Sequence, residues 1–388
     1  MSRHRIIHLI RAALLVVALS PVGFAHAQRG PATFTLGAAT GRIDRGFSRI
    51  TGAAELRDGR LVIADPTELG VFVLDLARRS VAQIGRAGPG PDEYERPYGV
   101  LRAPGDTLIV ASPGGRFLRI DPAGRIAGPV RVNLTPGAGG MSIPRAIDLL
   151  GRYYWSSDFV TRDPQRRFRR NRAPTIKRWV PGHDSAIVVA TFADHAPDMT
   201  EKRFHPYAER DAWVVAPDGR VGVLVAADYR LRWIRDGRVV GEGGPIPFER
   251  IVIGRAERDA YRDWRARMPA GSAQVIAPST SAGASDAARR QAAAAYPDDM
   301  FPRTLPPFEE DGAWLSPGGE IWVARSRAAN DAIPVIDVLD PSGTLRGSLR
   351  LPAGRRLLAL EPNGVYLVHT DDDGLQWVER YAWPAGLR

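Results

Sequence analysis

The chain has 388 residues and a formal net charge of +10, and it lacks cysteine, which excludes a disulfide framework and a lipidated amino-terminal cysteine. Charged residues make up 25% of the sequence with both signs interspersed, which argues against a dedicated nucleic-acid-binding protein. Stability must therefore come from buried apolar surface, and the chain is long enough to supply it.

The amino-terminal segment has the pattern of a secretory signal peptide. Three arginines accompany a uniformly apolar stretch, residues 12–19, and Ala25 and Ala27 provide the small side chains that signal peptidase requires. The apolar stretch is too short for a stable membrane span, although an uncleaved anchor is the alternative. We expect residues 1–27 to be removed and residues 28–388 to be periplasmic or extracellular.

Turn glycines recur along the rest of the chain, at Gly59, Gly105, Gly151, Gly219, Gly319 and Gly364. The first two steps are both 46 residues and the last is 45, and insertions lengthen the other two. Short apolar runs such as 61–64 and 71–74 are bounded by Gly, Pro and Asp, as β-strands are. This period predicts an all-β fold, a six-bladed β-propeller of four-stranded antiparallel blades, with a β-sandwich or open meander as the alternative.

The last unit supplies only three predicted strands, near residues 357–361, 365–370 and 375–383. We expect the missing outer strand to come from the amino-terminal residues Ala32–Leu36. Such a strand would close the ring and remove an exposed edge.

Residues Ile84–Tyr94, followed by Pro97–Val100, resemble the signature of NHL-type six-bladed propellers. Exported bacterial members of that group typically read G-x-G-P-G-E-F and then P-x-G-V. Here Asp92 stands where that pattern has its last glycine, and Tyr94 replaces the phenylalanine. The resemblance implies the fold but leaves the function open, because such propellers include lyases, lactonase-like enzymes and binding modules.

The long connections are predicted to gather on one face. In a four-stranded blade, the B–C and D–A connections emerge on the same side, and the long ones belong to these two kinds: residues 85–97, 161–173, 193–210 and 241–308. Loops of this length are usually functional or disordered. We therefore expect a ligand to meet this loop-rich face.

Within the last of these connections, residues of about 245–305 are predicted to form a helical insertion between blades four and five. Glu249–Met268 and residues 285–295 have helix-forming composition, and the segment between them is small and polar. The insertion resembles a lid over the channel mouth, and a solvated excursion that braces blades four and five is the alternative.

Two loops carry candidate ligand-binding side chains. The first presents Glu93, Tyr94 and Arg96, and the alternative is a rigid connector in which Glu93 accepts backbone N–H bonds and Tyr94 packs between blades. The hairpin at 161–173 carries six arginines. Of these, Arg167, Arg169 and Arg170 are expected to bind phosphate or uronate groups, with a solvated loop as the alternative.

The third loop, residues 193–210, holds the weak catalytic candidates His195, Asp198 and His205 and the ligand-binding candidates Arg203 and Tyr207. Two histidines with acids nearby permit a metal or an acid–base pair, but no HExxH motif and no nucleophile elbow supports either. No cofactor is predicted, and a divalent metal such as Ca²⁺ is left open.

Four charged residues on predicted inner strands lie near the opposite mouth: Glu55, Arg102, Asp148 and Glu361. Their position argues against a lactonase-like site, which needs carboxylates on the loop-rich side. The sequence therefore favours a non-enzymatic module that binds a protein, a peptide or an anionic glycan through its loop-rich face. A hydrolase or lyase that uses the loop at 193–210, lactonase-like or peptide-processing, with or without a metal, is the alternative.

Overall fold

The computed structural model of the chain describes residues 31–113, 115–134, 143–157, 160–162, 168–171, 173–195, 206–267 and 285–387. The predicted signal peptide lies outside these residues. In the part of the chain that is described, no helix is long and apolar enough to cross a membrane.

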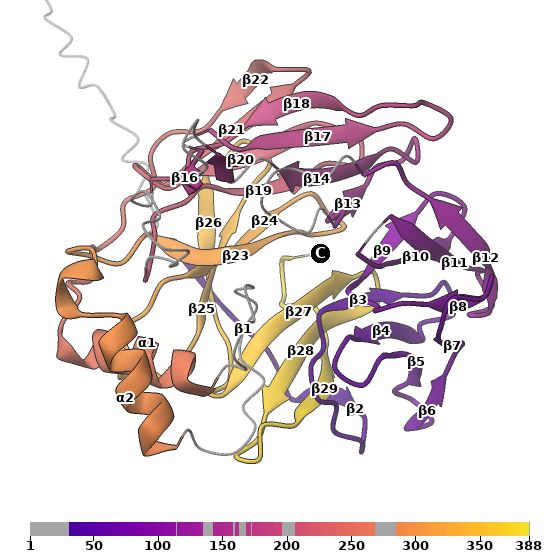
Figure 1. Cartoon of the computed structure of the whole chain (residues 1–388), viewed down its shortest axis with the longest axis horizontal. Coiled ribbons are helices and arrows are strands. Elements are labelled where there is room, and N and C mark those ends of the chain that lie inside the picture. The colour runs from indigo at the N-terminus through magenta and orange to yellow at the C-terminus, as the bar shows by residue number, and fades with distance from the viewer. Residues whose placement is uncertain are drawn as a thin grey trace, which may run out of the picture. The chain divides into compact units, whose positions relative to one another are not determined.

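The described residues form a six-bladed β-propeller of four-stranded antiparallel sheets (Figure 1). Blade one consists of β3 (Gly52–Glu55), β4 (Leu61–Asp65), β5 (Gly70–Asp75) and β6 (Ser80–Gln83). Blade two consists of β9 (Gly99–Ala103), β10 (Thr107–Ala111), β11 (Arg116–Ile120) and β12 (Ile126–Arg131). Blade three consists of β13 (Ala146–Ile147), β14 (Tyr153–Ser157), β17 (Thr175–Trp179) and β18 (Ile187–Thr191).

The second half of the ring repeats this arrangement. Blade four consists of β19 (Ala212–Val215), β20 (Val221–Val225), β21 (Arg230–Arg235) and β22 (Arg238–Glu242). Blade five consists of β23 (Phe308–Leu315), β24 (Ile321–Arg325), β25 (Val335–Leu339) and β26 (Leu345–Arg350). Blade six consists of β27 (Arg355–Glu361), β28 (Gly364–Thr370), β29 (Gln376–Tyr381) and the amino-terminal β2 (Ala39–Arg42).

The first strand of each blade is the innermost, and these six strands surround the centre of the ring (Figure 1). Each contacts the inner strand of the next blade, and β27 contacts β3, so the ring is closed. Glycine makes the closest of these approaches feasible, because a Cβ atom at Gly52 would lie 2.6 Å from the backbone nitrogen of Val100. The predicted fold is confirmed.

Apolar side chains pack between neighbouring blades, because each central strand has a hydrophobic residue on both faces of its sheet. Between blades one and two, Val62 and Val73 pack with Val110 and Leu118, all of them buried. Five further clusters of this kind follow around the ring. Each large buried side chain contributes roughly 1.5–3 kcal/mol, which explains how the fold is stable without disulfides.

The predicted closing strand was wrong in its residues. The strand that completes blade six is β2, which pairs antiparallel with β29, and it begins after the predicted Ala32–Leu36 segment. Most of that segment is β1 (Ala32–Thr35), which joins blade five as a fifth strand parallel to β26. Phe34 directs the choice, since its ring packs against the apolar cluster between blades five and six.

The long connections carry the remaining elements. The first holds β7 (Arg86–Ala87) and β8 (Glu93–Tyr94), and the arginine-rich hairpin consists of β15 (Val160–Arg162) and β16 (Phe168–Arg170). The insertion between blades four and five contains α1 (Arg255–Arg267), α2 (Asp286–Ala295) and a short 3₁₀ helix, Asp298–Met300. By strand order, every one of these segments emerges on the loop-rich face.

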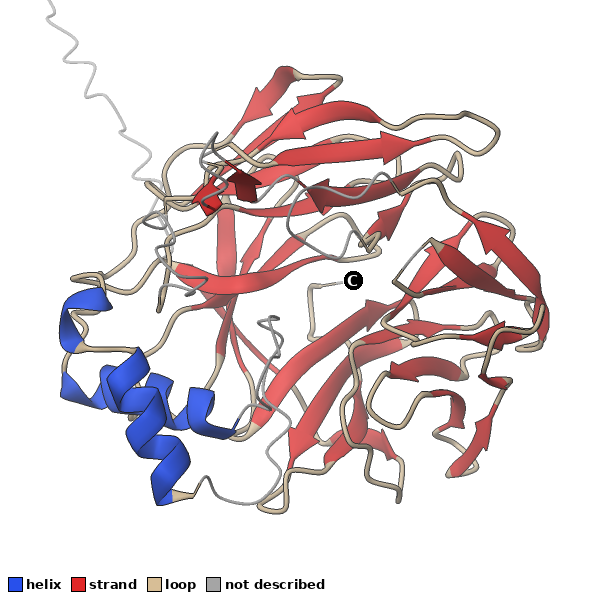
Figure 2. Cartoon of the chain, in the orientation of Figure 1, coloured by secondary structure: helices blue, strands red, loops and turns tan. Residues whose placement is uncertain are grey.

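The helices of the insertion lie at the rim of the ring and not over its centre (Figure 2), so the described part is not the predicted lid. Glu257 on α1 ties the insertion to blade five, because its two oxygens accept hydrogen bonds from the backbone nitrogens of Gly254 at 2.9 Å and Ala329 at 3.2 Å. Tyr207 and Tyr261 stack edge-on at 5.4 Å in an aromatic cluster beneath α1. The described helices therefore fit the alternative, an excursion that braces the blades, and the apolar face of α1 packs in a small core of the insertion itself.

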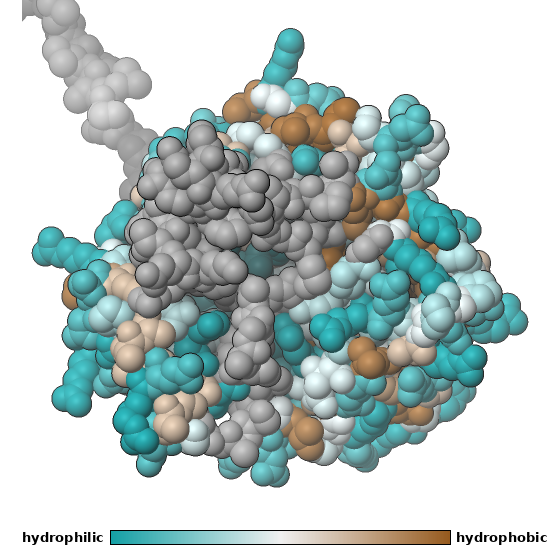
Figure 3. All heavy atoms as spheres, in the orientation of Figure 1, coloured by the Kyte–Doolittle hydropathy of each residue, from teal (hydrophilic) through white to brown (hydrophobic). Residues whose placement is uncertain are grey.

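Hydrophobic residues gather on the surface over β18 and β22, the outer strands of blades three and four (Figure 3). Ile187, Val188, Val239 and Val240 are 50–54% exposed. Val240 has no partner in the β21–β22 ladder, because the register shifts there by one residue. Such a bulge twists an edge strand away from regular pairing, which guards this apolar edge against aggregation.

Candidate functional site

Each of the six inner strands has a polar or charged residue close to its start, at the loop-rich face. We call this set the mouth ring, and it consists of Arg49, Tyr98, Arg145, Arg210, Glu309–Asp311 and Arg356, in the order of blades one to six. Because inner strands surround the central channel of a propeller, side chains at their starts lie around one mouth of that channel.

Blade five contributes its part through a bulge in β23. Phe308 pairs with Arg325 and Ala313 pairs with Val323, so β23 has three more residues than β24 between these pairs. Glu309, Glu310 and Asp311 are all exposed in this bulge, and Asp311 has a φ of 58°. A left-handed residue in an inner strand is strained backbone, and bulges and strain of this kind concentrate at functional sites.

On the side of blades three to five, the charges of the mouth ring neutralise one another. Arg210 forms ion pairs with Glu310 and, at 3.3 Å, with the buried Asp194. Arg145 pairs with Asp311 in the same way. This half of the mouth ring has a carboxylate for each of its arginines.

Glu309 differs from the other two acids of the bulge, because it is not paired with an arginine of the mouth ring. Its side chain is 49% exposed and lies 3.7 Å from Arg327. Burial nevertheless raises its pKa, and the opposing effect of Arg327 is smaller. The exposure and the raised pKa are compatible if one side of the carboxyl group contacts solvent at the mouth and protein surrounds its other sides.

On the side of blades six, one and two, the two arginines of the mouth ring, Arg49 and Arg356, form no ion pair with an acid among the described residues. Arg356 donates from Nη2 to the carbonyl oxygen of Ile50 at 2.8 Å and to Oε1 of Gln376 at 3.2 Å, both neutral acceptors. Its Nε is buried and has no partner in the described part of the chain. Burial, with a further contribution from Arg49, lowers the pKa of Arg356 to about 10. The guanidinium of Arg49 lies 5.8 Å from the ring centre of Tyr98.

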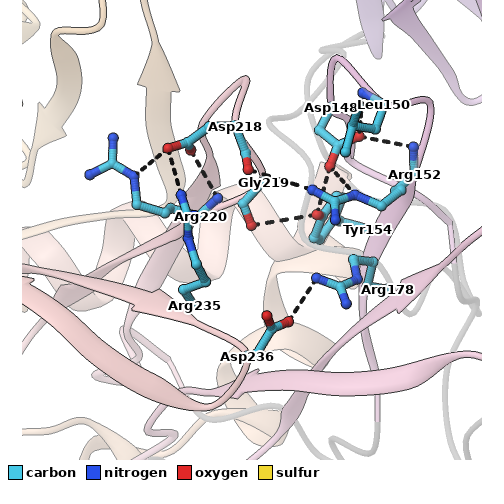
Figure 4. Close-up of polar contacts among 10 residues, drawn as sticks. All are labelled: Asp148, Leu150, Arg152, Tyr154, Arg178, Asp218, Gly219, Arg220, Arg235 and Asp236. Atoms are coloured by element: carbon cyan, nitrogen blue, oxygen red, sulfur yellow. Dashed lines mark hydrogen bonds and ion pairs between the residues drawn. The ribbon is translucent and has the colours of Figure 1, made fainter.

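The opposite face, which carries the short turns, differs in that its charges pair with one another, mostly within a blade and also between blades three and four, where Arg178 donates to Asp236 at 2.8 Å (Figure 4). Asp148 accepts hydrogen bonds from Nε of Arg152 at 2.5 Å and from the hydroxyl of Tyr154 at 2.8 Å. Arg220 and Arg235 both donate to Asp218 at 2.8 Å. Because these charged groups already bind one another, we assign the described part of the turn face a structural role.

The predicted candidates of the first loop are held by local contacts. Glu93 accepts hydrogen bonds from the backbone nitrogen of Gly90 at 2.6 Å and from Nε of Arg86 at 2.5 Å, and these two contacts lower its pKa. Tyr94 is 2% exposed and its hydroxyl accepts a hydrogen bond from the backbone nitrogen of Val71. Arg96 is exposed.

These contacts are those of the connector interpretation. The loop also borders an open hollow of about 410 Å³, which is lined by Gly85, Arg86, Gly90, Pro91, Asp92 and Glu93. Ligand binding by Glu93, Tyr94 and Arg96 stays a prediction.

Of the other predicted candidates, only some lie in the described part of the chain, and these do not form a common site. His195 is exposed, and its backbone nitrogen donates to the carbonyl oxygen of Glu209 at 2.9 Å. Tyr207 faces the insertion, where its hydroxyl donates to the carbonyl oxygen of Glu257 at 2.8 Å and burial raises its pKa to about 12. Arg169 and Arg170 lie on β16. The remaining candidates lie outside the described residues: Arg167, Asp198, Arg203 and His205.

Metal binding finds no support among the described residues, since no three His, Asp or Glu side chains there converge on a point where an ion would fit. The acids of the mouth ring are paired with arginines. Asp148 and Asp218 on the turn face are paired with arginines as well. We therefore derive no chemistry through a metal.

Sequence reasoning missed the mouth ring. It considered charges near the ends of the inner strands, such as Glu361, and not those at their starts. A signal was present, because Arg49, Arg145 and Arg210 each lie one to three residues before an inner strand. Glu309–Asp311 gave no such signal, since three acids in a row are typical of a connection rather than of a strand.

No protein-family model and no curated protein matches the chain. Among solved structures, a gluconolactonase from Xanthomonas campestris is 12% identical, covering 91% of this chain and 99% of that one, with a TM-score of 0.45. The calcium-binding protein regucalcin from Agrobacterium tumefaciens is 14% identical, covering 90% and 96%, with a TM-score of 0.44. Virginiamycin B lyase from Staphylococcus aureus is 11% identical, covering 87% and 81%, with a TM-score of 0.39.

Likenesses this distant carry no argument about activity, and the NHL-type resemblance stays a prediction. What is established is the architecture: the chain is a six-bladed β-propeller with four-stranded antiparallel blades.

Proposed function

We propose that this protein is an exported binding module that takes a protein, peptide or anionic glycan at the channel mouth of its loop-rich face. The observation that carries the proposal is the mouth ring, to which every blade contributes at the start of its inner strand. The turn face offers no comparable set, because its described acids Asp148 and Asp218 are paired with arginines of their own blades.

The energetics of the mouth favour a binding role. An arginine without a counter-charge in a partly desolvated position costs free energy, and so does a left-handed aspartate in an inner strand. Arg356 and Asp311 both carry such costs at the same mouth. A ligand that interacts with these groups would offset the costs, which is the usual reason for strain at a binding site.

Hydrogen–deuterium exchange tests the location of binding. The protein would be incubated with pooled oligouronates and, separately, with pooled acidic peptides. We expect protection at residues 49–51, 98–100 and 309–313, which begin inner strands. Residues 216–220, on the turn face, are the internal control and should exchange as before. Protection at the turn face alone, or nowhere, would contradict the proposal.

A hydrolase or lyase is the second candidate, and Glu309 is the observation that favours it. Burial raises the pKa of this carboxyl group, so it keeps its proton at a higher pH than an ordinary glutamate and can serve as a proton donor. Activity on simple lactones and on oligouronates distinguishes the candidates, if it is measured for the wild type and for Glu309→Gln. If the wild type turns a substrate over and Glu309→Gln does not, the protein is an enzyme that uses Glu309. If the wild type binds without turnover, the binding function is retained and the enzyme is rejected.

A further inference from the structure

We infer that Arg49 and Arg356 form the seat for an oxyanion, a carboxylate, phosphate or sulfate group of the ligand, where blade six meets blade one. This inference rests on the binding function proposed above and names the chemical group that the mouth would recognise.

The guanidinium of Arg356 is positioned by neutral groups only. Gln376 is the central one, because its Oε1 accepts hydrogen bonds both from Arg356 and, at 2.7 Å, from the backbone nitrogen of Ile50. The carbonyl oxygen of Ile50 in turn accepts from Nη2 of Arg356 at 2.8 Å. This closed triangle fixes the side chain and leaves Nε and Nη1 without an acceptor among the described residues. A guanidinium carries five N–H donors, and the unused ones on Nη1, together with the positive charge of the group, suit an oxyanion.

Arg49 adds a second positive charge at the same place. It precedes Ile50, and its charge helps to lower the pKa of Arg356, so the two guanidinium groups repel one another. Asp65 forms no ion pair with either guanidinium, and its carboxylate accepts backbone N–H bonds from Arg49 at 2.8 Å, Thr67 at 2.9 Å and Glu68 at 3.0 Å. The aromatic ring of Tyr98 borders Arg49.

The other half of the mouth ring shows how the fold treats an arginine that needs no ligand. Arg210 lies close to the start of the inner strand of blade four, and it has two carboxylates, Asp194 and Glu310. Arg145 in blade three has Asp311. The same architecture supplies acids there, and none of the described residues supplies one at Arg356, so the oxyanion of the proposed ligand would be the counter-charge of this arginine.

The chemistry of the seat selects oxyanions over other groups. Arginine binds carboxylate and phosphate through charge-assisted hydrogen bonds, which are shorter and stronger than hydrogen bonds between neutral groups. Two guanidinium groups close together would hold one such group and lose their mutual repulsion. A uronate unit of a glycan and a phosphorylated group share this chemistry.

Small anions test the seat without knowledge of the full ligand. The melting temperature of the full mature chain would be followed by scanning fluorimetry in a low-chloride zwitterionic buffer. Sodium glucuronate and inorganic phosphate would be added separately, at ionic strength matched with a quaternary-ammonium chloride control. We expect a saturable rise in melting temperature with at least one anion, and the stronger of the two identifies the source as uronate or phosphate.

Three variants make the result specific. Arg356→Gln and Arg49→Gln should lose the anion-dependent rise, whereas Arg220→Gln, on the turn face, should keep it. In buffer without added anion, Arg356→Gln should melt at the same temperature as the wild type or above it, because the substitution removes repulsion and keeps an amide that can bond Ile50. A structural role would have the opposite signature, a lowered melting temperature with the anion response intact, and that result would overturn the inference.

The outcome also separates this inference from the function on which it rests. Ligand protection at the starts of the inner strands together with an anion response unchanged in Arg356→Gln would retain the binding module and reject the seat. An absence of anion response in the wild type would reject the seat as well.

Discussion

Arg102 of blade two donates a hydrogen bond from Nη2 to Oε2 of Glu361 in blade six, at 2.5 Å, across the turn-face end of blade one. The same nitrogen donates to the carbonyl oxygen of Glu55 in blade one at 2.7 Å. Glu55 completes the contact, because its carboxylate accepts hydrogen bonds from Tyr366 and from the backbone of Asn363 in blade six. One small cluster therefore joins the first and last blades, where the ring closes.

This cluster predicts a pH-dependent stability. Burial raises the pKa of Glu361 to about 7 from its ordinary 4.5, and Arg102 opposes that rise only in part. Between these pH values, the folded protein holds a proton that the unfolded chain has released. The stabilisation is thus fully present below pH 4.5 and is lost as the pH rises through about 7.

Denaturant unfolding at a series of pH values measures this effect. The wild type should lose up to about 3 kcal/mol more than Glu361→Gln between the two ends of this range. Glu379→Gln is a control of opposite sign. Although burial acts to raise the pKa of Glu379, its hydrogen bonds with Arg355 and Tyr381 outweigh burial and lower it. Parallel curves for the wild type and Glu361→Gln would contradict the prediction.

Two facing glycines test the packing of the inner strands. Gly52→Ala should destabilise the protein by roughly 1–3 kcal/mol, because the new Cβ would overlap the backbone of Val100 at 2.6 Å and neither strand can move freely in a closed ring. Gly99→Ala is the matched control, since its nearest neighbour, the Cβ of Ala111, is 3.9 Å away. Thermal melting of both variants gives the comparison. Equal melting temperatures would mean that the inner strands pack less tightly than described.

The attachment of the helical insertion depends on Glu257. In Glu257→Gln, one of the two side-chain acceptors becomes a donor and can no longer accept from Gly254 or Ala329, at a local cost of about 1–3 kcal/mol. Hydrogen exchange should accelerate in residues 255–267 and stay unchanged in β24. Exposed Asp259→Asn, on the same helix, should leave the exchange of the helix as it is. Faster exchange throughout blade five would show that the insertion supports the propeller itself.

The fold could be predicted from the sequence because its turns demand particular residues. Gly59 and Gly105 have φ values of 86° and 75°, which other residues rarely adopt, so the period of glycines records the period of the blades. The closing strand was misjudged because the pattern of residues 32–36 predicts an outer strand, and the contact that places it in blade five is made by Phe34 with residues far away in the chain. Local pattern does not specify which blade it joins.

The site was harder to predict for a different reason. Whether Arg210 is neutralised and Arg356 is not depends on partners far away in the chain, such as Glu310 and Gln376. No spacing rule places these together, because the insertions between blades differ in length. The three-residue bulge of β23 adds to the difficulty, as it breaks the alternation that marks a strand.

The central claim, that the loop-rich mouth binds an anionic ligand, is tested most directly by isothermal titration calorimetry with an oligouronate. Wild-type protein, Arg356→Gln and the turn-face variant Arg220→Gln would be compared at one salt concentration. A charge-assisted hydrogen bond contributes roughly 1.5–3 kcal/mol, so Arg356→Gln should bind about tenfold more weakly or worse, while Arg220→Gln should equal the wild type. Equal affinity for all three proteins, or a loss confined to Arg220→Gln, would contradict the account.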